Sequence, residues 1–72
     1  MNTARMKSVM ILYGDTSAVL AGTIGVSPQT FSAKINERNG AEFTQGEISK
    51  IKERYNLSPE EIDSIFFNEK VS

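Results

Sequence analysis

The stretch that decides the fold is LAGTIGVSPQTFSAKI, residues 20–35, which has the spacing of two short helices joined by a tight turn. Ala21 supplies the small side chain that two steeply crossing helices need where they touch. Gly25, four residues later, tolerates the positive φ of the turn. Ser27 is a preferred N-cap, and Pro28 suits the first helical position, where its missing N–H costs nothing. The pattern therefore predicts a helix-turn-helix.

Apolar residues around Ser27 fix the orientation of the second helix of this motif. Val26 precedes the cap and Phe31 falls at the fourth helical position, so the two make a hydrophobic staple. Phe31 and Ile35, four residues apart, then lie on one face of the helix and point inward. We expect this helix to run from Pro28 to about Arg38.

The rest of the chain predicts further amphipathic helices and no strand. Gly14 ends the first helix, Asp15 caps the second, and Asn39-Gly40 ends the third. The expected helices are about Thr3–Tyr13, Thr16–Thr23 and Pro28–Arg38, a fourth from its N-cap Thr44 to Asn56, and a fifth that opens at Ser58 and Pro59. The last two begin with capping boxes, which pair Thr44 with Glu47 and Ser58 with Glu61.

The inward faces of these helices predict one core. Phe43 with Ile48 and Leu57 with Ile62 add two more staples. Phe67 is either part of the core or an exposed partner surface, and both readings stay open. The expected inward residues are Met6, Val9, Met10, Tyr13, Val19, Leu20, Phe31, Ile35, Ile48, Ile51, Tyr55, Ile62, Ile65 and Phe66. We expect a single domain over residues 1–72, with an ordered core of about 3–67 and a polar tail over 68–72.

Composition excludes several classes of function. The chain has 72 residues, enough for one small domain, and it has neither cysteine nor histidine. Disulfides and thiolate metal sites are thereby excluded, and the commonest general base and metal ligand are missing. We expect no catalytic residue, metal, cofactor or small-molecule substrate. No apolar run approaches the roughly 20 residues of a membrane span. No signal peptide is apparent, so we expect a cytoplasmic protein without a membrane partner.

Charge is the feature that complicates a DNA-binding interpretation. Domains that bind DNA usually carry a basic excess, because neutralising phosphates supplies much of the affinity. This chain has a net charge of −1. Within residues 15–38 the charged side chains are two acids and two bases, which sum to zero: Asp15, Glu37, Lys34 and Arg38. A local basic patch would still suffice for DNA, but the balance favours a partner other than DNA alone.

Two segments resemble known regulators. GVSPQTFSAKIN, residues 25–36, and FTQGEISKIKERYNLSPEEIDSIFF, residues 43–67, resemble small phage regulators of the lambda-repressor-like helix-turn-helix family. The resemblance covers about residues 15–67 and is close to the modulator-of-repression, or Cro-like, proteins of temperate lactococcal phages. It implies an all-α, compact five-helix DNA-binding domain in which helices two and three form the helix-turn-helix. Proteins of that group oppose the phage lysogeny repressor in the choice between lytic and lysogenic growth, partly by contacting it.

The resemblance also implies which residues bind a partner or DNA. The groove-facing positions would be Ser27, Pro28, Gln29, Ser32, Ala33 and Asn36. Thr30, Lys34 and Arg38 lie beside them within reach of phosphates. Ser17 stands where the family often has a glutamine that steadies the recognition helix. Gln29 and Asn36 can pair with adenine. None of the six groove-facing residues is Arg or Lys, so the commonest contact to guanine is missing. Without the resemblance, Gln29, Ser32 and Asn36 would be interpreted as polar residues on a solvent-exposed helix face.

Two functions remain open at this point. One is a stand-alone, Cro-like DNA-binding repressor that acts on palindromic operators. The other is an antirepressor, or modulator of repression, that binds the N-terminal DNA-binding domain of the phage lysogeny repressor in the bacterial host cell. Operator DNA is then a further partner of the complex. The missing basic excess favours the second. An enzyme is disfavoured by the absent catalytic residues, and a purely structural module does not explain the helix-turn-helix spacing.

Overall fold

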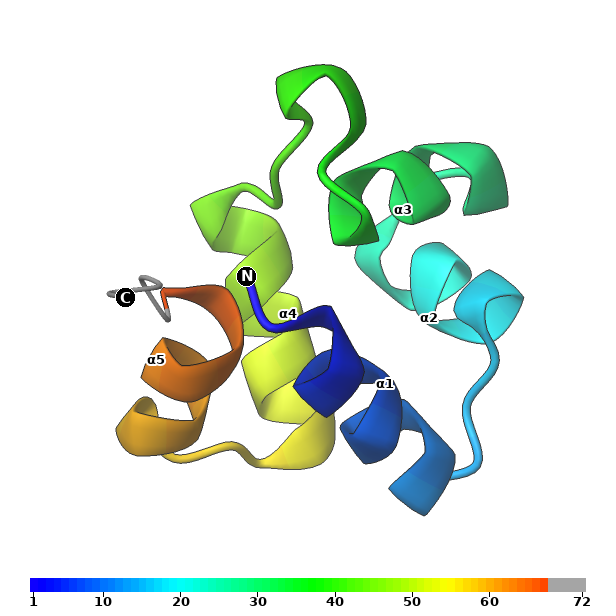
Figure 1. The fold of residues 1–72 in the computed structure, drawn as a ribbon. Helices are drawn as coiled ribbons and strands as arrows, with labels where there is room; N and C mark the ends of the chain where they lie inside the picture. Colours follow the sequence, from blue (N-terminus) through cyan, green and yellow to red (C-terminus); the bar gives the residue numbers. More distant parts are fainter. Residues whose placement is uncertain (68–72) are drawn as a thin grey trace.

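The computed structural model describes residues 1–67, which fold into five α-helices without a strand (Figure 1). The helices are α1 (Thr3–Leu12), α2 (Ser17–Ile24), α3 (Pro28–Ile35), α4 (Gln45–Tyr55) and α5 (Pro59–Phe66), with a short 3-10 turn, η1 (Arg38–Gly40), before α4. The radius of gyration is 11.4 Å, close to the value of about 11 Å expected for a folded domain of this length. The prediction of an all-helical, compact five-helix fold is confirmed.

Each helix begins at a polar side chain that accepts a hydrogen bond from a backbone N–H three residues later. The five caps are Asn2, Thr16, Ser27, Thr44 and Ser58. Thr44 and Ser58 form complete capping boxes with Glu47 and Glu61, as predicted. Asn56 ends α4 in the left-handed conformation, with φ of 51°. The starts at Ser27, Thr44 and Ser58 depend on neighbouring residues alone, which is why the sequence predicts them.

The start of α2 differs from the prediction. Asp15 does not cap this helix; Thr16 does, through a hydrogen bond of 3.2 Å from the Val19 N–H to the Thr16 hydroxyl. The Asp15 carboxylate instead accepts hydrogen bonds from Arg54 Nε at 2.7 Å and from the Tyr55 hydroxyl at 2.5 Å. The guanidinium of Arg54 on α4 stabilises the Asp15 carboxylate more than a backbone N–H would, because charge-assisted hydrogen bonds are stronger than neutral ones.

The end of α3 was also predicted wrongly. The helix stops at Ile35 and does not continue to Arg38. Asn36 follows as its C-cap and donates its side-chain Nδ2 to the Ser32 carbonyl at 2.9 Å, which satisfies one of the last free carbonyls. Glu37 then adopts a left-handed backbone with φ of 54°, and that conformation cannot continue a right-handed helix.

One apolar core joins the helices, with α2 packed on α3 and α4 and α1 packed on α5. In Figure 1 the pair α2 and α3 (cyan to green) lies on one side, and α4 and α5 (yellow to orange) on the other. Ala21 is completely buried, in agreement with its predicted place at the helix crossing. The buried residues are Met6, Met10, Leu20, Ala21, Ile24, Phe31, Ile35, Ile51, Tyr55, Leu57, Ile62 and Ile65.

Five other expected core residues lie nearer the surface. Val9, Ile48 and Phe66 are half-buried against the core. Val19 is 49% exposed, because Leu20 and Ile24 define the inward face of α2 and Val19 lies off it. The helix α1 ends one residue before Tyr13, which is its C-cap. The Tyr13 ring is half-exposed and lies 4.8 Å from the Tyr55 ring, so it covers the end of α4 from outside.

The inward placement of Val19 and Tyr13 was therefore wrong. The expected polar tail, residues 68–72, lies outside the described residues. Within the part of the chain that is described, no helix combines the length and the apolar character needed to cross a bilayer.

Candidate partner-binding surface

The turn between α2 and α3 is built as the sequence predicts. Gly25 ends α2 with φ of 84°, a conformation that glycine adopts without steric cost. The next N–H, from Val26, donates to the Ala21 carbonyl at 2.9 Å. No atom lies within 4 Å of a Cβ built at Gly25, so this position needs glycine for its backbone conformation and not for space. The Ser27 side chain then accepts the Thr30 N–H at 3.1 Å and fixes the start of α3.

The predicted contact residues all lie at the surface, but not all on one element. Most belong to α3 or its two ends, whereas Ser17 is the first residue of α2 and Arg38 lies in η1. Exposed side chains are those of Ser17, Ser27, Pro28, Gln29, Thr30, Asn36 and Arg38; those of Ser32, Ala33 and Lys34 are partly exposed. The structure thus brings together an α3 face made of Ser27, Pro28, Gln29, Thr30, Ser32, Ala33 and Asn36, none of which is charged.

Several polar groups of the α3 face are bonded within their own helix. The Ser27 hydroxyl donates to Thr30 Oγ1 at 3.0 Å. The Asn36 amide donates to the Ser32 carbonyl and is therefore turned back along α3. Of the two amide side chains on the α3 face, Asn36 forms hydrogen bonds within the helix, and Gln29 forms none with residues 1–67. It is the best placed of the predicted adenine-reading groups to contact a partner.

Lys34, the one cation of α3, is held by Glu47 of α4. Its ammonium donates to the two Glu47 carboxylate oxygens at 2.6 and 2.8 Å. The side chains of Lys34 and Glu47 are only 15% and 14% exposed. Burial works to raise the pKa of Glu47, but hydrogen bonds from Lys34 and the Thr44 N–H outweigh it, and the pKa is lowered. The α3 surface therefore presents no uncompensated positive charge.

The sequence suggested only the capping role of Glu47. That role is real, because its Oε1 also accepts the Thr44 N–H at 2.9 Å. The signal that could have shown the second role is weak. It would require knowing that Glu47, the third residue of α4, lies beside Lys34, thirteen residues earlier. That follows only from the tertiary fold, in which α2 packs on both α3 and α4.

A second network, centred on Asp15, holds the start of α2. The Asp15 side chain is 7% exposed and accepts from Arg54 Nε and Nη2 at 2.7 and 2.8 Å. These hydrogen bonds, and that from Tyr55, lower the pKa of Asp15 from 3.8 to about 2. Burial and the Asp15 charge raise the pKa of the Tyr55 hydroxyl. The loop before Ser17 is thus tied to the end of α4, and sequence reasoning missed this link between residues far apart in the chain.

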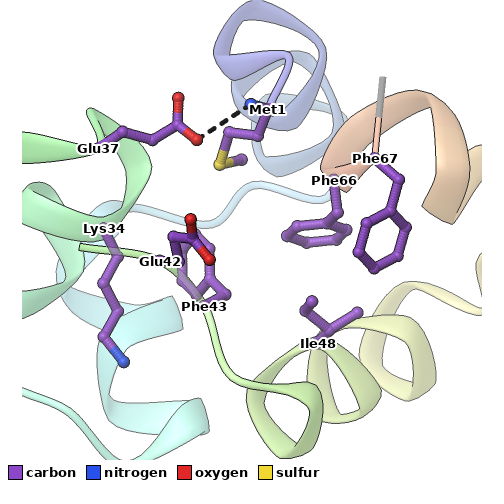
Figure 2. A pocket seen from close by; sticks show the side chains of 8 residues that line it. All are labelled: Met1, Lys34, Glu37, Glu42, Phe43, Ile48, Phe66 and Phe67. Atoms are coloured by element: carbon purple, nitrogen blue, oxygen red, sulfur yellow. Dashed lines mark hydrogen bonds and ion pairs between the residues drawn. The ribbon is translucent and has the colours of Figure 1, made fainter. Parts of the chain in front are cut away.

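An aromatic hollow lies beside the far end of α3 (Figure 2). It has a volume of about 250 Å³ and is lined by Met1, Lys34, Glu37, Glu42, Phe43, Ile48, Phe66 and Phe67. The Phe43 and Phe66 rings meet edge to face, with centroids 5.7 Å apart. Phe67 is 52% exposed, and its ring centre lies 6.5 Å from that of Phe66. Of the two alternatives for Phe67, the structure shows the exposed one.

Known proteins add no assignment to this geometry. No protein-family model, no curated protein and no solved structure matches the chain. Among residues 1–67 there is also no group of three acidic side chains placed to hold a metal ion. The functional interpretation therefore depends on the residues of the surface and on the resemblance of the two segments that contain α3, α4 and α5.

Proposed function

We propose that this protein is a phage transcriptional regulator of the modulator-of-repression type. It controls the choice between lytic and lysogenic growth by binding the N-terminal DNA-binding domain of the phage lysogeny repressor in the cytoplasm of the bacterial host. In this proposal α2 and α3 are the helix-turn-helix of a lambda-repressor-like domain. The resemblance of residues 25–36 and 43–67 to phage regulators supplies the class of protein. The pairing of Lys34 with Glu47 is the observation that favours a protein partner.

DNA binding would require charge that the α3 face does not offer. Sequence-independent affinity for DNA comes from lysines and arginines that neutralise phosphates. Lys34 already has a carboxylate partner, and moving it to a phosphate would leave the Glu47 carboxylate without its cation beside a polyanion. The next basic residue, Arg38, lies in η1 beyond the end of the helix. The α3 face is therefore weakly suited to bind DNA alone.

A protein partner meets fewer obstacles on the same surface. An uncharged face can be covered without the cost of removing ions from water. The small side chains of Ser32 and Ala33 allow the axis of a partner helix to approach α3 closely. Gln29 and Ser27 supply hydrogen-bonding groups at the edge of that contact. If the covered repressor helix is the one that reads DNA, the contact withdraws it from the operator; if the contact lies elsewhere on the repressor, operator DNA can be the third member of the complex.

Calorimetry with the repressor's N-terminal domain tests this proposal. Ser32→Arg places a long charged side chain in the contact and should weaken binding by at least about tenfold, the loss that corresponds to 1.4 kcal/mol. Ser49→Arg is the matched control, because Ser49 is an exposed serine on α4. Equal binding by the wild type and Ser32→Arg would show that the α3 face is not the contact, and a lack of binding by the wild type would reject the proposal.

One observation supports the alternative of a stand-alone, Cro-like repressor. The N-terminal end of α3 is exposed and displays Gln29, the residue type that pairs with adenine. In this case the purified protein alone binds a palindromic operator in gel shifts at low salt, with affinity that falls steeply as salt rises. Gln29→Ala should then cost about 1–3 kcal/mol at one base position. If the wild-type protein alone binds the operator specifically and Gln29→Ala loses that binding, the stand-alone repressor is favoured over the antirepressor.

A further inference from the structure

A second surface, on a different element from the α3 face, lies along the exposed side of α1. We call it the α1 shelf; it consists of Ala4, Arg5, Lys7, Ser8, Ile11 and Leu12, all exposed. Ile11 and Leu12 are 76% and 79% exposed, more than any other large apolar side chain among residues 1–67. Together they form a small apolar patch that a partner protein can cover.

The fold does not need Ile11 or Leu12 to be apolar. The buried face of α1 is supplied by Met6 and Met10. The helix is also anchored at its beginning, where the Asn2 N–H donates to the Ile65 carbonyl at 2.7 Å. The shelf therefore lies on a helix that is anchored at its start and along its buried face, and Ile11 and Leu12 are not part of the core.

Shallow hollows lie on both sides of the aliphatic end of α1. One, of about 330 Å³, lies toward α5 and has Leu12, Val9 and Ile65 in its lining. The other, of about 230 Å³, lies toward the start of α2 and has Ile11 and Lys7 in its lining. Ile11 and Leu12 thus form a ridge between two depressions, a shape that the side chains of a partner helix can straddle.

The shelf itself carries two cations, and one carboxylate lies at its α5 edge. Arg5 and Lys7 are the charged residues of α1, and neither forms an ion pair among the described residues. The two acids that line the hollows are bonded within the molecule. The charge of Asp15 is compensated by Arg54, whereas Glu61 accepts the neutral Ser58 N–H at 2.8 Å and remains a charged carboxylate at the α5 edge. A partner therefore meets two uncompensated cations that lie before two aliphatic side chains.

From this arrangement we infer that the α1 shelf binds an amphipathic helix of a partner protein, with aliphatic side chains on one face and acidic side chains beside them. The aliphatic groups of the partner cover Ile11 and Leu12, and its carboxylates pair with Arg5 and Lys7. The small residues Ala4 and Ser8 let the two helix axes approach to about 8–10 Å. A second copy of this chain fits poorly, because α1 carries two cations and no acid, so a symmetric pairing of two α1 helices brings like charges together.

This inference goes beyond the proposed function, since it concerns another surface and requires neither repressor nor DNA. Its test is an NMR titration of the isotope-labelled full chain with a synthetic helical peptide of about 14 residues, four helical turns. The peptide carries leucines at i, i+3, i+4 and i+7 and glutamates beside them. A second peptide has lysine in place of each glutamate. We expect the acidic peptide to bind at least about tenfold more tightly and to shift amide resonances within residues 4–17.

Variants make the test specific. The double change Ile11→Ser and Leu12→Ser should reduce the affinity for the acidic peptide by at least about tenfold without lowering the melting temperature. Val19→Ser is the matched control, because Val19 is a half-exposed aliphatic residue of α2 outside the shelf. Arg5→Glu with Lys7→Glu should reverse the preference, so that the lysine peptide binds better.

Several results would overturn the inference. Equal binding of the two peptides, or resonance shifts that map to α3 or to the aromatic hollow, would exclude the shelf as an acidic-helix site. A dimer that depends on Ile11 and Leu12 in sedimentation, or binding to anionic lipid vesicles lost in the same double variant, would assign the shelf to another occupant. Because the peptides contain no repressor sequence, failure here leaves the proposed function standing, and failure to bind the repressor leaves the shelf standing.

Discussion

Lys34 and Glu47 form a two-point ion pair across the junction of α3 and α4, with the Lys34 ammonium 2.6 and 2.8 Å from the two carboxylate oxygens. The pair changes what α3 presents to a partner. It removes the positive charge that a helix reading DNA would use. It also gives a carboxylate that already caps α4 a second partner, so one side chain serves both the fold and the character of the surface.

Releasing Lys34 should make the protein bind DNA better. Glu47→Gln keeps an oxygen that can cap α4 but removes the charge that holds Lys34. We expect a stability loss of about 1 kcal/mol, together with tighter non-specific DNA binding at low salt in fluorescence anisotropy. Glu61→Gln is the matched control, since Glu61 occupies the same capping position in α5 without a lysine partner. If the two variants bind DNA equally, Lys34 is not what limits DNA affinity.

Acid should weaken the link between Asp15 and Arg54. The hydrogen bonds from Arg54 and Tyr55 hold the pKa of Asp15 at about 2 in the folded protein, below its ordinary value of 3.8. The folded state thus binds this proton less readily than the unfolded state, so the stabilisation is complete above about pH 4 and is lost as the pH falls toward 2. Urea unfolding across this window should show a smaller loss of stability with acid in Asp15→Asn than in the wild type.

The control for that experiment is Asp63→Asn, an exposed carboxylate of α5 without an ion pair among the described residues. This variant leaves the link between Asp15 and Arg54 intact and should therefore still lose the stability that this link contributes as the pH falls toward 2. An Asp15→Asn profile parallel to that of the wild type would contradict the assigned pKa.

Two glycines near the turn should respond oppositely to alanine. Gly25→Ala forces an alanine to a φ of 84° and should cost about 1–2 kcal/mol. Gly22 lies within α2 with open space around its Cβ position, so Gly22→Ala should stabilise the protein by up to about 1 kcal/mol through helix propensity. Equilibrium unfolding in urea measures both. A Gly25→Ala variant as stable as the wild type would show that the turn relaxes to another conformation.

Two phenylalanines should differ strongly in their contribution to stability. Phe31 is completely buried, and Phe31→Ala should cost about 3–5 kcal/mol, enough to unfold a domain of this size. Phe67 is half-exposed, so Phe67→Ala should cost less than about 1 kcal/mol. Thermal unfolding followed by circular dichroism separates these outcomes. A large loss in Phe67→Ala would mean that Phe67 is covered in solution.

The features that sequence predicted well are local. The cap at Ser27, the capping boxes at Thr44 and Ser58 and the turn at Gly25 each depend on residues within one helical turn. The features that it missed depend on contacts between distant segments. Asp15 was wrongly expected to cap α2. Its actual partner, Arg54, lies thirty-nine residues later, and no local pattern indicates that contact.

The same distinction applies to the candidate site. The exposed residues of α3 follow from the helical period once Phe31 and Ile35 point inward. Whether Lys34 is available to a partner depends on where α4 places Glu47, and no spacing rule within α3 contains that information. The exposed end of α1 escaped notice for a related reason. Its periodicity identified Met6 and Met10 as core, but it gave no indication that Ile11 and Leu12 would remain uncovered.

In the proposed function, this protein acts on the lysogeny repressor and not on DNA alone. Size-exclusion chromatography with light scattering, run on the full chain mixed with the repressor's N-terminal domain, with and without operator DNA, tests it most directly. We expect a stoichiometric protein–protein complex that forms without operator, and no stable complex of this protein with operator alone at physiological salt. Separate elution of the two proteins, together with binding of the operator by this protein alone, would contradict the proposed function.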